Sequence, residues 1–253
     1  MTDSGTVVFQ TSSGVGTIVF EHPSSNSLPG MLLSQIADCI DQAGRDSSCA
    51  VIVLKSGGNR AFCAGASFDE LIAIENKEQG LEFFSGFSKV ILAIRRCPKF
   101  VICSVQGKAV GGGVGIVAAA DYAVATKHAA VKLSELAIGI GPFVVGPAVE
   151  RKIGLSAFQT LAIDATQWFS AEWALDHGLF ARIHETIEAL DADVERLANQ
   201  LAKSSPEAMA QLKKAAWSGT EHWDQLLPER AAISGALVLS AFTANAIAAF
   251  KQK

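Results

Sequence analysis

The stretch Gly111-Gly112-Gly113-Val114-Gly115 places four glycines within five residues, between the apolar runs Val101–Val105 and Ile116–Ala120. Inside a helix or strand, each glycine costs about 0.5–1 kcal/mol in backbone entropy. A chain tolerates that cost where its backbone must approach another group closely or where free N–H groups are needed. The first turn of a helix has unpaired N–H donors and a partial positive charge. The stretch therefore predicts a helix start that can hold an anion or a developing oxyanion.

Length and composition favour one large folded domain, or a core with a smaller appendage. The chain has 253 residues, of which 49% are apolar and 18% are charged, so it can bury a sizeable core. The formal net charge of −4 provides no basic footprint for nucleic acid. No window approaches the roughly 18–20 apolar residues that a membrane span needs. We therefore expect neither nucleic acid nor a membrane as a partner.

Cysteine usage and the start of the chain indicate a cytoplasmic protein. The five cysteines are odd in number and scattered in mostly apolar surroundings, which is typical of reduced thiols rather than of a disulfide framework. The polar start Met1–Gly5 has none of the features of a signal peptide.

Strand and helix signals alternate in the first part of the chain, and only helix signals follow Glu185. This order predicts an α/β core at residues 1–195 and a C-terminal helical region at 196–253. The expected strands are Val7–Phe9, Gly16–Phe20, Ala50–Leu54, Phe100–Val105, Tyr122–Thr126 and Leu179–Ile183. The expected helices are Met31–Ala43, Leu81–Arg96, Gly146–Ile153, Ser156–Ala162, Ala171–His177, Ile187–Lys203, Pro206–Trp217, Leu226–Leu239 and Ala241–Phe250.

A second helix start is expected immediately after Ala66. Ser67 followed three residues later by Glu70 matches a capping box. The helices that begin near Ala66 and Gly112 each follow a buried strand, so both N-termini are expected at the same edge of the core. Two N–H groups there would stabilise an enolate on a thioester carbonyl, and one such donor lowers the barrier by roughly 2.7–4 kcal/mol in a known case. The alternative is that the glycines only allow a helix to pack closely on a strand.

The glycine stretch also matches the dinucleotide fingerprint G-x-G-x-x-A, at Gly113, Gly115 and Ala118. The context is poor, because the strand Phe100–Val105 ends well before the first of these glycines. The acid about 20 residues further on, Glu135, also falls beyond the next predicted strand. A nicotinamide-dependent enzyme is therefore a third-ranked alternative.

Other catalytic signatures are missing from the sequence. It has no G-x-S-x-G nucleophile motif, and we interpret Ser67 as a helix cap. It has no H-x-x-x-H or C-x-x-C pair, so we expect no metal. The neighbours of Cys63 are apolar and would not lower the pKa of its thiol.

Several motifs in a fixed order carry a family resemblance. They are Ala61-Phe62-Cys63-Ala64-Gly65-Ala66, Val105–Gly113, Asp121-Tyr122, and Leu133-Ser134-Glu135-Leu136 with Gly139. Over nearly its whole length the chain resembles the enoyl-CoA hydratase/isomerase (crotonase) family. The resemblance implies a β/α spiral core, a C-terminal helical trimerisation region, and a homotrimer or a hexamer of two trimers. It also implies an acyl-CoA substrate whose thioester oxygen is held by the N–H groups of Ala66 and Gly112, and no cofactor besides the coenzyme A of the substrate.

One position departs from the pattern of the family's hydratases, which typically carry two glutamates. Glu135 matches the second, whereas Gly115 stands where the first is expected. A single carboxylate can move one proton between carbons, as in the family's Δ3,Δ2-enoyl-CoA isomerases. These also resemble this chain at Gly139-Ile140-Gly141-Pro142-Phe143. We therefore prefer isomerisation, with Glu135 as the acid/base. A true hydratase, a glutaconyl-type decarboxylase and a non-catalytic acyl-CoA-binding protein remain alternatives.

The resemblance also suggests where the substrate binds. CoA is expected beside Arg60, with Lys55 as a weaker candidate and Lys251 or Lys253 of a neighbouring subunit as possible aids. The loop Glu75–Phe87 and the tail are expected to line the acyl pocket. The other expected substrate-binding residues are Phe62, Ala64, Gly65, Gly111, Pro142 and Phe143. Apolar neighbours of Glu135 are expected to raise the pKa of its carboxyl toward the working pH.

Overall fold

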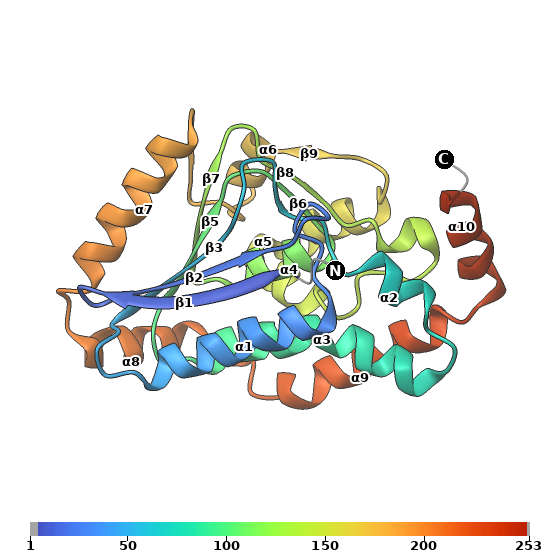
Figure 1. Cartoon of the computed structure of the whole chain (residues 1–253), viewed down its shortest axis with the longest axis horizontal. Helices are drawn as coiled ribbons and strands as arrows, with labels where there is room; N and C mark the ends of the chain where they lie inside the picture. Colours follow the sequence, from blue (N-terminus) through green and yellow to red (C-terminus); the bar gives the residue numbers. More distant parts are fainter. Residues whose placement is uncertain (1–4, 252–253) are drawn as a thin grey trace.

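Two β-sheets form the centre of the molecule, and helices cover them on several sides (Figure 1). The computed structural model describes residues 5–251, with side chains up to Ala249. Lys253 and the side chain of Lys251 therefore lie outside the described part. The first sheet contains, in spatial order, β1 (Thr6–Ser12), β2 (Val15–Glu21), β3 (Val51–Ser56), β5 (Val101–Val105), β7 (Tyr122–Thr126) and β10 (Arg182–His184). The second sheet contains β4 (Ala61–Cys63), β6 (Lys108–Val110), β8 (Ala130–Lys132) and β9 (Phe169–Ser170).

The two sheets are built mainly from parallel strands, as a chain that alternates strands and helices requires. The exceptions are the hairpin of β1 and β2 and the antiparallel pair of β8 and β9. The hairpin turns at Ser13 and Gly14, which both have positive φ (51° and 82°), as a tight two-residue turn demands. The predicted α/β class is confirmed.

Ten α-helices and one 3₁₀ segment are present in the described residues. They are α1 (Gly30–Arg45), α2 (Phe68–Ile72), α3 (Lys77–Arg96), α4 (Gly112–Ala119), the 3₁₀ segment η1 (Glu135–Ile138), α5 (Gly146–Ile163), α6 (Ala171–Asp176), α7 (Ile187–Leu201), α8 (Pro206–Ala216), α9 (Trp223–Leu237) and α10 (Ala241–Lys251). The predicted pair of helices after residue 146 appears as α5, interrupted at Gly154, where φ is 80° and ψ is 160°.

Alternate residues of β3 face two separate apolar cores. Ile52 and Leu54 belong to the main core, whereas Val51 and Val53 pack with residues of α7. Because successive side chains of a strand point to opposite faces, a strand covered by helices on both sides has a continuous apolar sequence. This explains the unbroken apolar run that marked β3 as buried.

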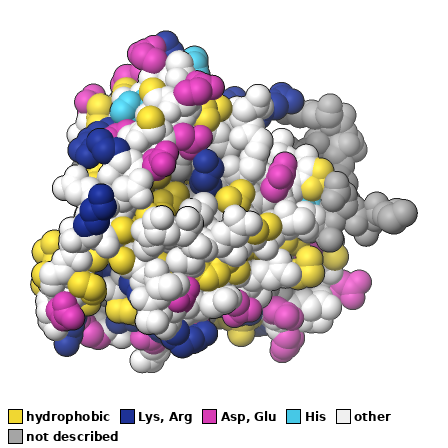
Figure 2. All heavy atoms as spheres, turned by 60° about the vertical axis from the view of Figure 1, so that its left-hand side comes forward, with side chains coloured by type: hydrophobic (Ala, Val, Ile, Leu, Met, Phe, Trp, Pro, Cys, Tyr) yellow, Lys and Arg dark blue, Asp and Glu magenta, His cyan; other side chains and the backbone are white. Residues whose placement is uncertain are grey.

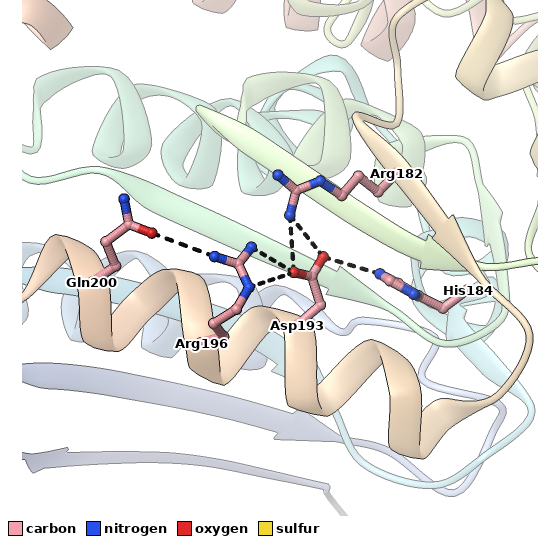
Figure 3. A network of polar contacts seen from close by, with 5 residues as sticks. All are labelled: Arg182, His184, Asp193, Arg196 and Gln200. Carbon is pink, nitrogen blue, oxygen red and sulfur yellow. Dashed lines mark hydrogen bonds and ion pairs between the residues drawn. The ribbon is translucent and has the colours of Figure 1, made fainter.

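An ionic network centred on Asp193 fastens α7 to the edge strand β10 (Figure 3). Arg182 Nη1 donates to both carboxylate oxygens of Asp193 at 2.9 and 3.0 Å, and Arg196 Nη2 donates at 2.7 Å. His184 Nε2 lies 3.0 Å from the same carboxylate. Burial acts to raise the pKa of Asp193, but the hydrogen bonds from Arg196, Arg182 and His184 hold it well below its usual range.

On the face shown in Figure 2, acidic and basic side chains are interspersed with apolar ones.

A buried ion pair attaches the C-terminal helices to the core. Lys213 Nζ of α8 lies 2.7 Å from Asp121 Oδ2 and donates to the backbone oxygen of Lys99, also at 2.7 Å. The Asp121 carboxylate also accepts from Trp217 Nε1 at 3.0 Å and from the Val101 amide at 2.8 Å. Each of the two side chains thus has several polar partners, which offset the cost of burying the pair. A helical C-terminal region is therefore confirmed, although the proposed boundary at 195/196 falls inside α7 and the division itself stays a prediction.

The helix expected over Leu81–Arg96 begins earlier, at Lys77, so the expectation of a loop over Glu75–Phe87 was wrong. Asn76 caps this helix, and its Oδ1 accepts from the Gln79 amide at 2.9 Å. The sequence also gave no signal for β6 or β8, which have only three residues each. Gly80 sits in the first turns of α3 for a packing reason. Its Cβ position lies 2.7 Å from Gly235 Cα, so α3 and α9 cross with their backbones in contact.

No single helix among residues 5–251 combines the length and the apolar composition of a bilayer span. In that part of the chain, α9 and α10 satisfy these criteria only as a pair, with a bend of 72° between them.

Replacement of Gly235 by Ala tests the helix crossing. At a roomy helical site this change stabilises a protein by roughly 0.5–1 kcal/mol. Here we expect destabilisation of about 1–3 kcal/mol, because the new methyl group meets the backbone of α3. Thermal unfolding should show a lower Tm for Gly235→Ala, while Ala236→Ser, at an exposed site on the same helix, should leave Tm nearly unchanged. A higher Tm for Gly235→Ala would contradict the crossing.

Candidate active site

Parallel strands β4 and β6 bring the two predicted helix starts together. Ala61 is in register with Lys108, and Cys63 with Ala109. The segments that follow are also in contact, since the Cβ position of Gly65 lies 3.5 Å from the Val110 oxygen. The structure therefore brings the segments around Ala66 and Gly112 to one place, as expected from the strand order.

The backbone N–H of Ala66 donates to no acceptor among the described residues, whereas the neighbouring backbone groups are hydrogen-bonded. Leu28 N donates to Gly65 O at 2.8 Å, Ser67 N donates to Leu28 O at 3.2 Å, and Ser27 Oγ donates to Ala66 O at 2.9 Å. Ser67 caps α2, with its Oγ accepting from Glu70 N at 3.3 Å. The Glu70 carboxylate does not complete the capping box, because it accepts from Gly30 N of α1 at 2.9 Å.

Gly112 is the first residue of α4, and its amide likewise has no acceptor within the described part of the chain. The preceding amide, of Gly111, donates to Lys132 O at 2.8 Å, while Val114 N and Gly115 N donate to Gly111 O. Gly111 has φ of +53°, a backbone conformation that favours glycine. The unpaired amide of Gly112 thus stands at the positive end of a buried helix, where an oxyanion is stabilised.

Glu135 begins η1, and its carboxylate lies directly against this turn. Glu135 Oε1 is 3.0 Å from the Cβ position of Gly111. Although the residue as a whole is partly exposed, Oε2 is sealed from solvent and has no hydrogen-bond partner. Burial raises the pKa of Glu135 to about 7. A carboxyl group with this pKa can accept or donate a proton near neutral pH.

Hydrocarbon fills the space around Gly115, one turn into α4. Its Cβ position lies 2.4 Å from Val145 Cγ1 and 3.6 Å from Ile91 Cδ1. All residues of α4 are buried. A larger side chain at this position would require the surrounding core to move.

The other predicted binding residues lie in different surroundings. Arg60 is exposed and forms no ion pair within residues 5–249, whereas Lys55 Nζ pairs with Asp191 at 2.8 Å. Phe62 is fully buried and packs edge-on against Phe20, with ring centroids 5.4 Å apart. Only its backbone is therefore available to a ligand.

Three further positions of the predicted set are partly exposed: Ala64, Pro142 and Phe143. The ring of Phe143 packs on Gly141, whose φ is +89°.

Burial raises the pKa of Cys63 to about 12, so its thiol stays protonated near neutral pH. In the described residues, no group of three or more His, Cys, Asp or Glu side chains is arranged to hold a metal ion.

The sequence predicted that residues 75–87 and the C-terminal tail line the acyl pocket, but it did not single out two features of this site. The ring of Phe87 lies against Gly112, 2.2 Å from its Cβ position. A small apolar cluster also surrounds the residues that follow Glu135. Its members are Leu71, Ile140 and Val238, with Phe68, Ile74, Phe83, Phe84, Ile138 and Ile247 packed against them. The pair Phe83-Phe84, inside the expected helix Leu81–Arg96, was the available signal, but its packing partners are distant in sequence.

Comparisons with known proteins agree with this arrangement. The profile of the family described as Enoyl-CoA hydratase/isomerase matches residues 10–245. The short-chain-enoyl-CoA hydratase of Clostridium acetobutylicum is 28% identical over 211 residues, which is 83% of this chain and 80% of that protein. The mitochondrial Delta(3,5)-Delta(2,4)-dienoyl-CoA isomerase of Mus musculus is 25% identical over 197 residues, which is 73% of this chain and 59% of that protein.

The fold is also shared with solved structures. The crystal structure of an enoyl-CoA hydratase from Bacillus halodurans has a TM-score of 0.88 and 22% identity, and the match covers 96% of this chain and 99% of that one. Since the family profile spans most of the chain and the fold matches throughout, the protein is an enzyme of the enoyl-CoA hydratase/isomerase family.

Proposed function

We propose that this enzyme moves a proton between carbon atoms of an enoyl-CoA thioester, with Glu135 as its single acid/base group. The N–H groups of Ala66 and Gly112 donate to the thioester oxygen and stabilise the enolate that forms there. Glu135 removes a proton from the α-carbon of a 3-enoyl thioester and returns it to the γ-carbon. The double bond shifts by one position, and no water or cofactor is consumed.

The packing around Gly115 is the observation that carries this proposal. Hydration needs one group to activate water and another to manage the proton at the α-carbon. In the described part of the chain, Val145 and Ile91 occupy the space beside Gly115, so no second carboxylate is supplied from this position. Proton transfer between carbons needs only the group that is present, Glu135.

The state of the Glu135 carboxyl supports the same chemistry. A carboxylate with one sealed oxygen that has no hydrogen-bond partner is costly in the resting enzyme, and burial raises the pKa of Glu135 to about 7. Protonation of Glu135 therefore lowers the free energy of the buried group, and a pKa near neutrality still allows it to release the proton. The apolar cluster around Leu71, Ile140 and Val238 suits a hydrocarbon acyl chain beside this group.

Three other activities fit parts of the site. Hydration is possible if a neighbouring subunit supplies an acid, and the Clostridium relative is named a hydratase. Decarboxylation of a glutaconyl-type thioester needs only the oxyanion donors and one proton donor. A non-catalytic acyl-CoA-binding protein would retain the pocket alone.

We also propose that the protein forms a homotrimer or a hexamer of two trimers, which light scattering on the purified protein tests.

Replacement of Glu135 by Gln tests the proposed acid/base. The amide keeps the shape of the side chain but cannot accept the proton. Turnover of a 3-enoyl-CoA should therefore fall by about 10²–10⁴-fold, while calorimetric binding of the thioester persists. Asp69→Asn, at an exposed acid of α2, is the matched control and should retain full turnover. Wild-type turnover in Glu135→Gln would exclude the assignment.

The pH dependence follows from the raised pKa of Glu135. The carboxylate must be ionised to take the α-proton, so kcat/KM should be low in acid, rise roughly tenfold per pH unit, and level off above about pH 7. The profile is measured from about pH 5 to about pH 9 with the wild type. A profile that stays flat down to about pH 5, as an ordinary glutamate with a pKa of about 4.3 gives, would show that the base is exposed or is another group.

A substrate pair separates isomerisation from hydration. Wild-type enzyme is incubated in parallel with crotonyl-CoA and with a 3-enoyl-CoA, and NMR follows both the position of the double bond and the addition of water. Conversion of the 3-enoyl to the 2-enoyl thioester should be the faster reaction, because it needs one carboxylate. Faster addition of water to crotonyl-CoA would contradict one-carboxylate chemistry.

A further inference from the structure

Two side chains flank the peptide bond that carries the unpaired amide of Gly112. Before this bond, Glu135 Oε1 lies 3.0 Å from the Cβ position of Gly111. After it, Phe87 Cζ lies 2.2 Å from the Cβ position of Gly112. Phe87 is only 6% exposed. A group that accepts a hydrogen bond from this amide therefore has a carboxylate near one end of the peptide bond and an aromatic ring near the other.

The ring of Phe87 lies at the same end of α4 as the unpaired amide. In a helix the Cα–Cβ bond tilts toward the N-terminus, and the first N–H groups point the same way. Since Cβ stands about 2.5 Å from the amide nitrogen of its own residue, Phe87 Cζ lies within about 5 Å of the Gly112 nitrogen. An oxygen that accepts from this nitrogen lies about 2.9 Å away, and the carbon two bonds beyond that oxygen is also within about 5 Å. The ring and this carbon therefore share one small region.

The face of α3 that contains Phe87 extends from the core to the apolar cluster beside Glu135. Ile91, one turn later on α3, has its Cδ1 3.6 Å from the Cβ position of Gly115. Phe84, three residues earlier, packs against the cluster. Because residues three and four apart share a face of a helix, Phe87 stands between these two contacts. The first carbons of an acyl chain that runs from the start of α4 into the cluster pass this ring.

Close packing of α3 on its neighbours holds Phe87 in place. The Cβ position of Gly86, the preceding residue, lies 2.7 Å from Leu33 Cδ1 of α1. On another side, the backbone of α3 meets that of α9 at Gly235. Phe87 itself belongs to the main core. Since a close-packed interior has no space to give up, the ring forms a fixed wall beside the amide of Gly112.

We propose that Phe87 determines specificity by excluding a substituent on the α-carbon of the acyl group, so that the enzyme takes thioesters that are unbranched at this carbon. The inference rests on the proposed function, in which the Gly112 amide holds the thioester oxygen. One α-hydrogen then points at Glu135, and the β-carbon points into the apolar cluster. The remaining substituent of the α-carbon faces the ring, where a hydrogen atom fits and a methyl group collides.

Binding of unreactive thioesters tests this specificity without turnover. Butyryl-CoA and 2-methylbutyryl-CoA, which differ by one α-methyl group, are titrated by calorimetry into wild type, Phe87→Leu and Phe87→Ala. Wild type should bind the branched thioester about tenfold or more weakly, as expected for one surplus methyl group in a packed pocket. This preference should shrink about tenfold in Phe87→Ala, and by less in Phe87→Leu. Phe100→Leu, in the separate core beside α7, is the matched control and should keep the wild-type preference.

Turnover of 3-hexenoyl-CoA and racemic 2-methyl-3-hexenoyl-CoA gives the matching kinetic ratio. The methyl group also changes the acidity of the α-carbon, but this effect is the same in every variant. The kcat/KM of the branched substrate relative to the unbranched one should therefore rise about tenfold in Phe87→Ala, whatever the total activity of the variant.

Equal affinity of wild type for the two saturated thioesters would overturn the proposal, and so would a wild-type preference that persists in both Phe87 variants. Phe87→Leu keeps an apolar side chain in the core, so the test stands even where Phe87→Ala is too unstable to purify. Since the preference in binding needs no chemistry, absence of turnover would count against the proposed function and not against the role of Phe87.

Discussion

The exclusion of side chains from the start of α4 is the constraint on which the site depends. At Gly111 the Cβ position lies against the Glu135 carboxylate, at Gly112 against the ring of Phe87, at Gly113 against Cys63, and at Gly115 against Val145. The missing side chain at each glycine thus leaves room for a different segment of the chain to pack there. At the other end of α4, Lys152 Nζ donates to the Ala120 oxygen at 2.8 Å, which satisfies a carbonyl that the helix leaves unpaired. The helix is therefore held at both ends, and its first amide stays open beside the only unpartnered buried carboxylate oxygen among the described residues.

This packing gives the glycines of the stretch different consequences for chemistry. Close approach at Gly111 and Gly112 brings a carboxylate and an unpaired amide to the same turn. At Gly115 the absence of a side chain leaves room for Val145 to pack in the apolar core. A glutamate there would have to displace Val145, so the second carboxylate expected in a hydratase is absent for a steric reason as well as by sequence. Burial is the main influence on the pKa of Glu135, opposed by a hydrogen bond from its own backbone.

Much of this arrangement was predictable from the sequence, since it follows from local signals. Ser67 marked the start of α2, continuous apolar runs marked β3 and β5, and the family motifs led to Glu135. Predictions failed where the structure depends on contacts distant in sequence. The start of α3 was missed because Gly80 is explained only by its contact with Gly235. The three-residue strands β6 and β8 exist through their neighbours and have no pattern of their own. The packing of Val145 on Gly115 was equally invisible, because nothing local links these two positions.

The exchange of substrate protons with solvent tests most directly whether an oxyanion site and one carboxylate suffice for chemistry here. A 3-enoyl-CoA is incubated with the wild-type enzyme in heavy water, and deuterium at the α- and γ-carbons is followed by NMR. Wild type should move the double bond without adding water across it and should incorporate deuterium wherever protonated Glu135 exchanges with solvent, whereas Glu135→Gln should show almost none of either. Thioester binding by the wild type with neither deuterium incorporation nor movement of the double bond would contradict this mechanism, and would identify the chain as an acyl-CoA-binding protein that has lost its chemistry.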